Sequence, residues 1–134
     1  QLCDILTFLH QLKPTIIHRD IKPENIFYKD GKVIIDSPFV SGNVSKNYTT
    51  PPGLFELYYK QKDRVLKGED YATPVKYWMP FNGGIGLHDA NWRGSFGGTI
   101  YQTNGSHGCI NLPPKVAAQV YENAYKGIPI ICCN

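Results

Sequence analysis

The residues best suited to chemistry lie in the segment SHGCIN at positions 106–111, where Cys109 follows a histidine and a glycine. A thiol attacks a carbonyl carbon as its thiolate, so it needs a nearby proton acceptor or a local positive potential. Two histidines are candidates for that acceptor: His107, two residues before the cysteine, and His88, twenty-one residues before it. This combination favours nucleophilic catalysis by Cys109.

The glycine and the asparagine beside Cys109 suit the same chemistry. Gly108 leaves the backbone open, so its N–H group and that of Cys109 can point at one spot, as an oxyanion hole requires. Asn111 supplies an amide that can hold the loop in one conformation. The segment therefore contains a nucleophile, a candidate base and candidate groups to stabilise a developing negative charge.

Two other interpretations of these residues are open at this point. A lone cysteine followed by isoleucine is commonly a small buried side chain. Alternatively, His88, His107 and Cys109 are side-chain types that bind zinc, although the spacing HGC is cramped for two ligands on one ion. The residue types alone do not decide among a nucleophile, a core residue and a metal ligand.

The composition predicts one globular domain. The chain has 134 residues, of which 42% are hydrophobic and 19% charged. A net charge of +3 is too weak to predict nucleic-acid binding, and the sequence has no run of 18 apolar residues that would predict a transmembrane segment. The four cysteines lack the spacing of a disulfide framework. Because the chain begins with glutamine rather than methionine, we expect it to be a fragment.

Apolar periodicity predicts a mainly β chain with few helices. Residues 1–12 have apolar side chains at helical spacing, and Pro14 ends this helix. Strands are expected at 15–21, 26–28, 32–36, 54–60, 75–81, 84–88 and 128–133. A second helix follows Pro113 and Pro114, and its apolar face consists of Val116, Ala117, Val120, Tyr121 and Ala124.

The segment 89–111, which carries Cys109, is rich in glycine, serine, asparagine and threonine and is expected to be a long loop. Long loops inside compact domains are more often functional than idle. The sequence therefore predicts that a loop presents Cys109, that His88 ends a strand, and that the second helix packs behind the loop.

The combination of His88 with the segment SHGCIN resembles the catalytic motif of the L,D-transpeptidases, the YkuD-type domain. In that motif, a histidine and a spacer precede Ser/Thr-His-Gly-Cys-x-Asn. The segments YKDGKVIIDSPFVSG, TTPPGLFEL, LKGEDYATPVKYWMPFNGGIGLHDANW and KGIPI are similar to the same family, so the resemblance covers residues 26–134. It implies a YkuD-like β-sandwich of mixed sheets, with one helix after the catalytic loop and a short N-terminal helix.

By this resemblance, the protein is a peptidoglycan L,D-transpeptidase. Such enzymes form a cysteine acyl-enzyme with a peptidoglycan stem peptide, release its terminal D-alanine and pass the acyl group to a neighbouring stem, which makes a 3→3 cross-link. Carbapenem inhibitors acylate the family. The resemblance also implies an extracytoplasmic location, in the cell wall or periplasm, and no requirement for a metal or cofactor. An L,D-carboxypeptidase and a catalytically inactive wall-binding domain are the alternatives.

The resemblance also implies roles for individual residues. Cys109 is the nucleophile, and His88 is the general base, oriented by the main chain of Asp89 in preference to its carboxylate. His107 adds positive character or binds substrate. The other positions carried over are Ser106 lining the site, Gly108 in the oxyanion hole, Asn111 holding the loop, Trp92 in the pocket wall, and Tyr77, Trp78 and Met79 in the substrate cleft.

A second resemblance conflicts with the first. The segment HRDIKPEN, residues 18–25, resembles the catalytic loop of a protein kinase, in which the positions of Asp20 and Asn25 orient the substrate hydroxyl and bind metal. DSPF stands where the kinase Asp-Phe-Gly would fall, so we expect no kinase activity. We interpret residues 1–25 as a chimeric or misassigned N-terminus outside the catalytic domain at 26–134, with residues 15–28 supplying the opening strands of the sheet.

Overall fold

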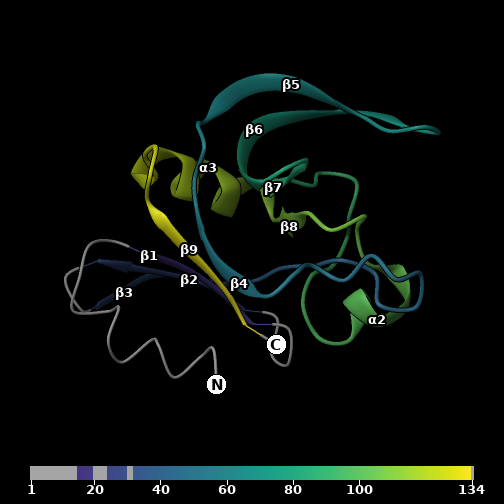
Figure 1. Ribbon diagram of the computed structural model, residues 1–134, viewed down its shortest axis with the longest axis horizontal. Coiled ribbons are helices and arrows are strands. Elements are labelled where there is room, and N and C mark those ends of the chain that lie inside the picture. Colours follow the sequence, from purple (N-terminus) through teal and green to yellow (C-terminus); the bar gives the residue numbers. More distant parts are fainter. Residues whose placement is uncertain (1–14, 20–23, 30–31, 134) are drawn as a thin grey trace.

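The computed structural model describes residues 15–19, 24–29 and 32–133 (Figure 1). The helix expected at residues 1–12 lies outside the described residues. The first sheet has the strand order β3-β2-β1-β9-β4. Its strands are β1 (Thr15–Arg19), β2 (Glu24–Lys29), β3 (Lys32–Pro38), β4 (Gly53–Glu56) and β9 (Pro129–Cys133).

The kinase-like segment contributes backbone to the centre of this first sheet. β1 is antiparallel to β2 and parallel to β9, so it is the middle strand of the five and joins the opening strands to the last one. The expected opening strands are therefore confirmed.

The second sheet has the strand order β5-β6-β7-β8. Its strands are β5 (Gln61–Lys67), β6 (Ala72–Asn82), β7 (Ile85–Asp89) and β8 (Ile110–Leu112). β7 and β8 are parallel neighbours, so the chain between them must return to the end of the sheet at which β7 begins. That crossover contains α2 (Ile100–Asn104) and the segment with Cys109.

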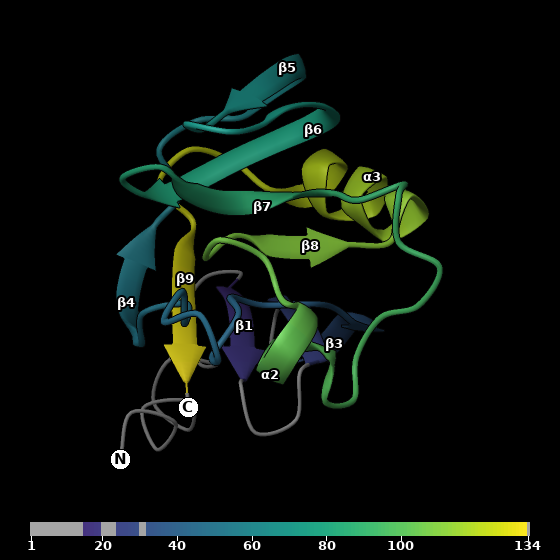
Figure 2. The ribbon, with the colours of Figure 1, turned by 90° about the vertical axis from the view of Figure 1, so that its right-hand side faces the viewer.

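The helix after the crossover, α3 (Pro114–Asn123), contacts β3, β6 and β7 and lies beside the second sheet in Figure 2. Its predicted apolar face is confirmed: Ala117, Val120 and Ala124 are buried, and Val116 and Tyr121 pack against the core. The fold is thus the expected mainly β arrangement of two mixed sheets, with α3 behind the cysteine segment. Among the described residues, no helix has the length and apolar character needed to span a membrane.

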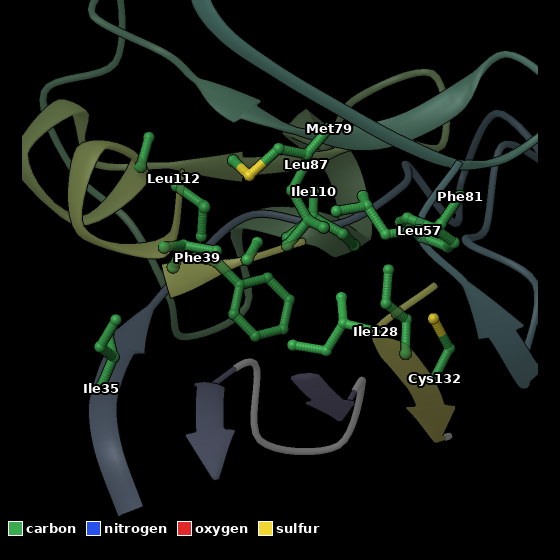
Figure 3. Packing of buried hydrophobic residues seen from close by; sticks show 14 residues of the cluster. Ile35, Phe39, Leu57, Met79, Phe81, Leu87, Ile110, Leu112, Ile128 and Cys132 are labelled. Atoms are coloured by element: carbon green, nitrogen blue, oxygen red, sulfur yellow. The ribbon is translucent and has the colours of Figure 1, made fainter. Parts of the chain in front are cut away.

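The hydrophobic core fills the space between the two sheets (Figure 3). Phe39 and Leu57 enter it from the connections that follow β3 and β4, Met79 and Phe81 from β6, and Leu87 from β7. This core supports β7 and β8, which carry the residues of interest.

A matched pair of leucines tests the position of the core. Leu57 is 1% exposed and Leu54 is 55% exposed. We expect Leu57→Ala to lower the free energy of unfolding by about 2–5 kcal/mol, because it removes buried surface and leaves a cavity. Leu54→Ala should cost less than about 1 kcal/mol. Urea denaturation measures both values, and equal losses would contradict this packing.

Three local expectations were wrong. β5 was not predicted, because the exposed sequence QKDRVLK lacks apolar alternation and becomes a strand by pairing with β6. The strand expected at 54–60 ends at Glu56, since Leu57 and Tyr58 donate to the carbonyls of Ile128 and Pro80 as the chain crosses between sheets. The loop expected at 89–111 contains α2 and runs into β8.

Candidate active site

The parallel register of β7 and β8 sets the relative positions of the cysteine and the histidine. His88 pairs with Asn111, and Leu87 pairs with Ile110. Cys109 directly precedes β8 and contacts the backbone of Gly86, so it lies two positions before His88 along the strand direction, a rise of about 6.6 Å. Residues two apart on neighbouring strands share a face of the sheet. The thiol and the imidazole therefore lie on the same face.

Both side chains line one cleft of about 450 Å³. Cys109 is half-buried in its wall, so it is not sealed in the core. β5, β6 and the turn between them form one side of the cleft, and the crossover forms the other. The lining residues are Leu66, Tyr71, Ala72, Thr73, Pro74, His88, Trp92, Arg93, Gly105, Ser106, His107, Cys109 and Asn111.

The Cys109 thiol is protonated at neutral pH in this environment. Burial raises the pKa of the thiol to about 11, and the backbone N–H of Gly86 opposes that shift only in part. The sulfur lies 3.7 Å from the main-chain oxygen of Gly84, to which the S–H group donates. The cysteine therefore needs a proton acceptor before it can attack a carbonyl.

His88 is a buried imidazole with a hydrogen-bond partner at each ring nitrogen, the main chain of Asp89 at Nδ1 and the Asn111 amide at Nε2. Nδ1 lies 2.8 Å from the main-chain oxygen of Asp89, which can only accept, so Nδ1 carries the proton. The Asp89 carboxylate accepts instead from the backbone N–H groups of Lys76 and Tyr77, at 2.9 and 2.8 Å. The main chain of Asp89, rather than its side chain, thus contacts the imidazole.

The electrostatic surroundings keep His88 neutral. Burial lowers the pKa of the imidazole, and the Arg93 guanidinium lowers it further, against the raising effects of the Asp89 carbonyl and carboxylate. A neutral Nδ1–H imidazole has its lone pair on Nε2, where a base can receive a proton. The pair is therefore a neutral thiol and a neutral imidazole, not a thiolate beside a cation.

The thiol and the imidazole are not hydrogen-bonded to each other in this structure. In the described part of the chain, no hydrogen bond joins Sγ of Cys109 to His88; the thiol donates to Gly84 instead. Transfer of the proton to Nε2 therefore requires the thiol to turn away from the Gly84 carbonyl and to take the place of the Asn111 amide N–H, whose nitrogen lies 3.1 Å from Nε2. Catalytic hydrogen bonds often form only when substrate is bound.

The segment 40–43 and Thr50 hold the loop that carries Cys109. Val40 exchanges two backbone hydrogen bonds with Asn111, at 3.0 and 2.8 Å, and Ser41 accepts from the N–H of Ser106 at 2.9 Å. The buried hydroxyl of Thr50 donates to the carbonyl of Gly108 at 2.7 Å. The loop is thus fixed by backbone groups that are far away in the sequence.

The expected oxyanion hole is only half available in this structure. The N–H of Gly108 donates to Oγ of Ser106 at 3.0 Å, and that hydroxyl donates in turn to the carbonyl of Cys109. The prediction that the Gly108 N–H points into the site is therefore wrong for the resting loop, because Ser106 turns back on it. Within the described residues, the N–H of Cys109 has no hydrogen-bond partner, so it remains a candidate donor.

Gly108 has a backbone conformation that suits glycine. Its φ is +126°, which side-chain-bearing residues rarely adopt, and a Cβ atom there would lie 3.2 Å from Cδ1 of Ile85. We expect Gly108→Ala to cost about 1–3 kcal/mol of stability and to slow acylation at least about tenfold. Gly94→Ala is the control, since a Cβ atom at Gly94 meets nothing within 4 Å. Thermal melts and acylation rates should separate the two variants. Equal losses in Gly108→Ala and Gly94→Ala would contradict the claim that a side chain at position 108 is strained.

His107 is exposed in the cleft wall and does not join the hydrogen bonds around the thiol. Its ring stacks on Tyr71, with centroids 5.0 Å apart, and packs at a tilt against Tyr48 at 4.9 Å. Neither tyrosine was predicted from the sequence. Tyr71 and His107 line the cleft beside Cys109, and Tyr48 packs against His107.

Of the aromatic residues expected in the cleft, only Trp92 lines it. Trp92 is 49% exposed, and its ring lies 5.9 Å from that of His88. The cleft prediction for Tyr77, Trp78 and Met79 is wrong. Side chains alternate along β6, which turns Tyr77 and Met79 to the core. Trp78 is buried, with its ring centroid 6.0 Å from that of His88, and does not line the cleft. The start of the strand, at 72–74, lines the cleft instead.

Sequence reasoning also missed Arg93 and Thr50. Arg93 is the single charged residue between positions 90 and 106, a signal that could have identified it. Thr50 lies in a loop-like segment, and nothing in its sequence surroundings marks it as a contact of Gly108. Within the described ranges, no three His, Cys, Asp or Glu residues gather to hold a metal ion, so His88, His107 and Cys109 do not form the zinc site considered above.

Known proteins resemble the chain in two ways, one of which is a partial match to protein kinases. The chain is 36% identical over 74 residues to cyclin-dependent kinase 4 of Ovis aries, a match that covers 54% of this chain and 23% of the kinase. The chain thus spans about a quarter of the curated relatives that it matches. The division expected at residue 25 stays a prediction, while β1 pairs with β9 in the structure.

The fold is that of L,D-transpeptidases. A mutant of the Enterococcus faecium L,D-transpeptidase superimposes with a TM-score of 0.85 and 37% identity, over 90% of this chain and 50% of that chain. The catalytic domain of the E. faecium enzyme, acylated by ertapenem, gives a TM-score of 0.79 and 38% identity, over 90% of this chain and 96% of that domain. The protein-family model of the YkuD L,D-transpeptidase catalytic domain matches residues 14–132. With its cysteine and histidine on one face of a shared cleft, the chain belongs to the YkuD family of L,D-transpeptidase catalytic domains.

Proposed function

We propose that this chain is a peptidoglycan L,D-transpeptidase that works through an acyl-enzyme on Cys109. The observation that carries the proposal is the placement of the thiol and of a neutral Nδ1–H imidazole, His88, on one face of a cleft of about 450 Å³. A cleft of that size holds a short peptide segment.

In the first half-reaction, Sγ of Cys109 attacks the carbonyl carbon between the third residue of a stem peptide and its terminal D-alanine. The thiol proton moves to Nε2 of His88 as the C–S bond forms. The N–H of Cys109 is the donor placed for the resulting oxyanion. The C–N bond then breaks, and the amine of D-alanine leaves with the proton that His88 received.

In the second half-reaction, a side-chain amine at the third residue of another stem attacks the thioester. His88 takes a proton from that amine and returns it to sulfur as the C–S bond breaks. The product is a 3→3 cross-link and the free thiol. Water in place of the amine gives an L,D-carboxypeptidase by the same steps.

The remaining residues position the reacting groups and the substrate. Asn111 and the main chain of Asp89 hold the imidazole, and Ser106 holds the loop. His107 and Trp92 form walls against which an extended peptide can pack. Because peptidoglycan is the substrate, we place the enzyme outside the cytoplasm, where carbapenems also reach it.

The direct test uses a disaccharide-tetrapeptide that ends in D-alanine, with products identified by mass spectrometry. The proposal predicts dimers linked between two third residues, together with free D-alanine. Tripeptide without dimers would identify a carboxypeptidase. Binding of intact peptidoglycan with no release of D-alanine would identify an inactive wall-binding domain and contradict the proposal.

A further inference from the structure

Arg93 is a half-buried cation, each of whose three guanidinium nitrogens donates to an oxygen atom of the site's own framework. Nη1 donates to the main-chain oxygen of Asn104, the last residue of α2, at 2.9 Å. Nε and Nη2 reach the Asn111 side-chain oxygen at 2.8 and 3.2 Å. In the part of the chain that the structure describes, no carboxylate pairs with this guanidinium. Its contacts therefore fix its position without neutralising its charge.

The guanidinium decides which way the Asn111 amide points. Arg93 has only donors, so the amide must turn its oxygen toward Arg93. The amide nitrogen then lies 3.1 Å from Nε2 of His88 and donates to it. The reverse orientation would set the amide N–H groups against the guanidinium N–H groups. Asn111 is 2% exposed, so water cannot replace a lost partner cheaply.

This orientation has a consequence when His88 receives a proton. The imidazolium N–H at Nε2 would face the N–H groups of the Asn111 amide, and both are donors. An asparagine free to rotate would relieve that conflict by presenting its oxygen. Arg93 opposes the rotation, so the locked amide disfavours the imidazolium, and the thiol proton reaches Nε2 only when the Asn111 N–H is displaced from it.

We propose that Arg93 is a positioning residue that acts on His88 through Asn111: the guanidinium locks the amide so that it donates to Nε2 and disfavours the imidazolium. The proposal rests on the proposed function only in taking His88 as the base. The titratable and charged groups that face His88 are Asp89 on its own strand, Arg93 on the crossover, and Cys109, His107 and Tyr71 across the cleft.

The test is a double-mutant cycle read by NMR titration of His88 in the whole chain, labelled with 15N-histidine. Arg93→Met should raise the midpoint of His88 by about 1 pH unit, because it removes both the charge and the lock. In the Asn111→Ala background, the same substitution should raise the midpoint by less than about half as much, since only the charge effect remains. Arg64→Met, at an exposed arginine, is the control and should leave the midpoint unchanged.

Two results would overturn the proposal. Equal shifts in the two backgrounds would mean that Arg93 acts by charge alone, and no shift would mean that it does not act on His88. If Arg93→Met does not fold, Arg93→Lys replaces it in the cycle: the charge remains, the two-pronged contact is lost, and a shift of about 0.3 pH units that disappears in the Asn111→Ala background is expected. The titration needs no turnover, so its failure is distinct from a failure of the transpeptidase assay.

Discussion

Cys109→Ala should abolish covalent capture of a carbapenem. Incubation of the unchanged chain with ertapenem should increase its mass by one acyl group, and peptide mapping should place that group on Cys109. The alanine variant should show no increase, with transpeptidation reduced on the order of 10⁴-fold or more, because no other group in the mechanism can form the thioester.

Cys132 provides the matched control for that experiment. It is the other cysteine whose side chain the structure describes, and it is 1% exposed in the core. Cys132→Ala should retain the full mass increase. An adduct that persists in the Cys109→Ala variant, or one that disappears with Cys132, would contradict the assignment of the nucleophile.

His88→Ala should slow acylation about 10²–10⁴-fold at neutral pH, which is the usual contribution of a general base. The effect is large because the pKa of the thiol is raised to about 11, so very little thiolate exists without a proton acceptor. Stopped-flow measurement of carbapenem acylation gives the rate. Thermal melting of the same samples separates a catalytic loss from a loss of fold.

Ser106→Ala is the comparison variant in the same cleft. Ser106 contacts the backbone of Gly108 and Cys109 and holds the loop, but it has no part in proton transfer. We expect it to slow acylation about tenfold, as removal of one positioning hydrogen bond does. Losses of equal size in the two variants would contradict the assignment of His88 as the base.

Local sequence identified the reacting residues because their chemistry is encoded in type and spacing. The sequence HGC supplies the nucleophile, and His88 at the end of an apolar strand was a visible candidate for the base beside His107. What brings them together is the parallel pairing of β7 with β8, which depends on a crossover of twenty residues. That pairing is a long-range property, and neither the local sequence nor its periodicity predicted it.

The wrong expectations share a physical cause. Tyr77 and Met79 have aromatic or flexible side chains that suit a cleft, but the two-residue period of β6 turns them to the core. The N–H of Gly108 was expected in the oxyanion hole, but it donates to Oγ of Ser106, whose rotamer the sequence does not reveal. Arg93 contacts the Asn111 amide, which in turn contacts His88, and the sequence does not reveal such a chain of contacts. The position of an apolar strand is thus predictable, while exposed strands such as β5, side-chain direction and hydrogen-bond partners depend on the assembled fold.

The pH dependence of acylation tests most directly whether His88 deprotonates Cys109 from a neutral pair. Between pH 7 and 9.5, the unchanged chain should acylate at a nearly constant rate, because the pKa of His88 lies below its ordinary value and that of the thiol is about 11. His88→Ala should instead accelerate about tenfold for each pH unit, as the thiolate fraction grows. Parallel profiles for the two proteins would show that the imidazole does not take the proton.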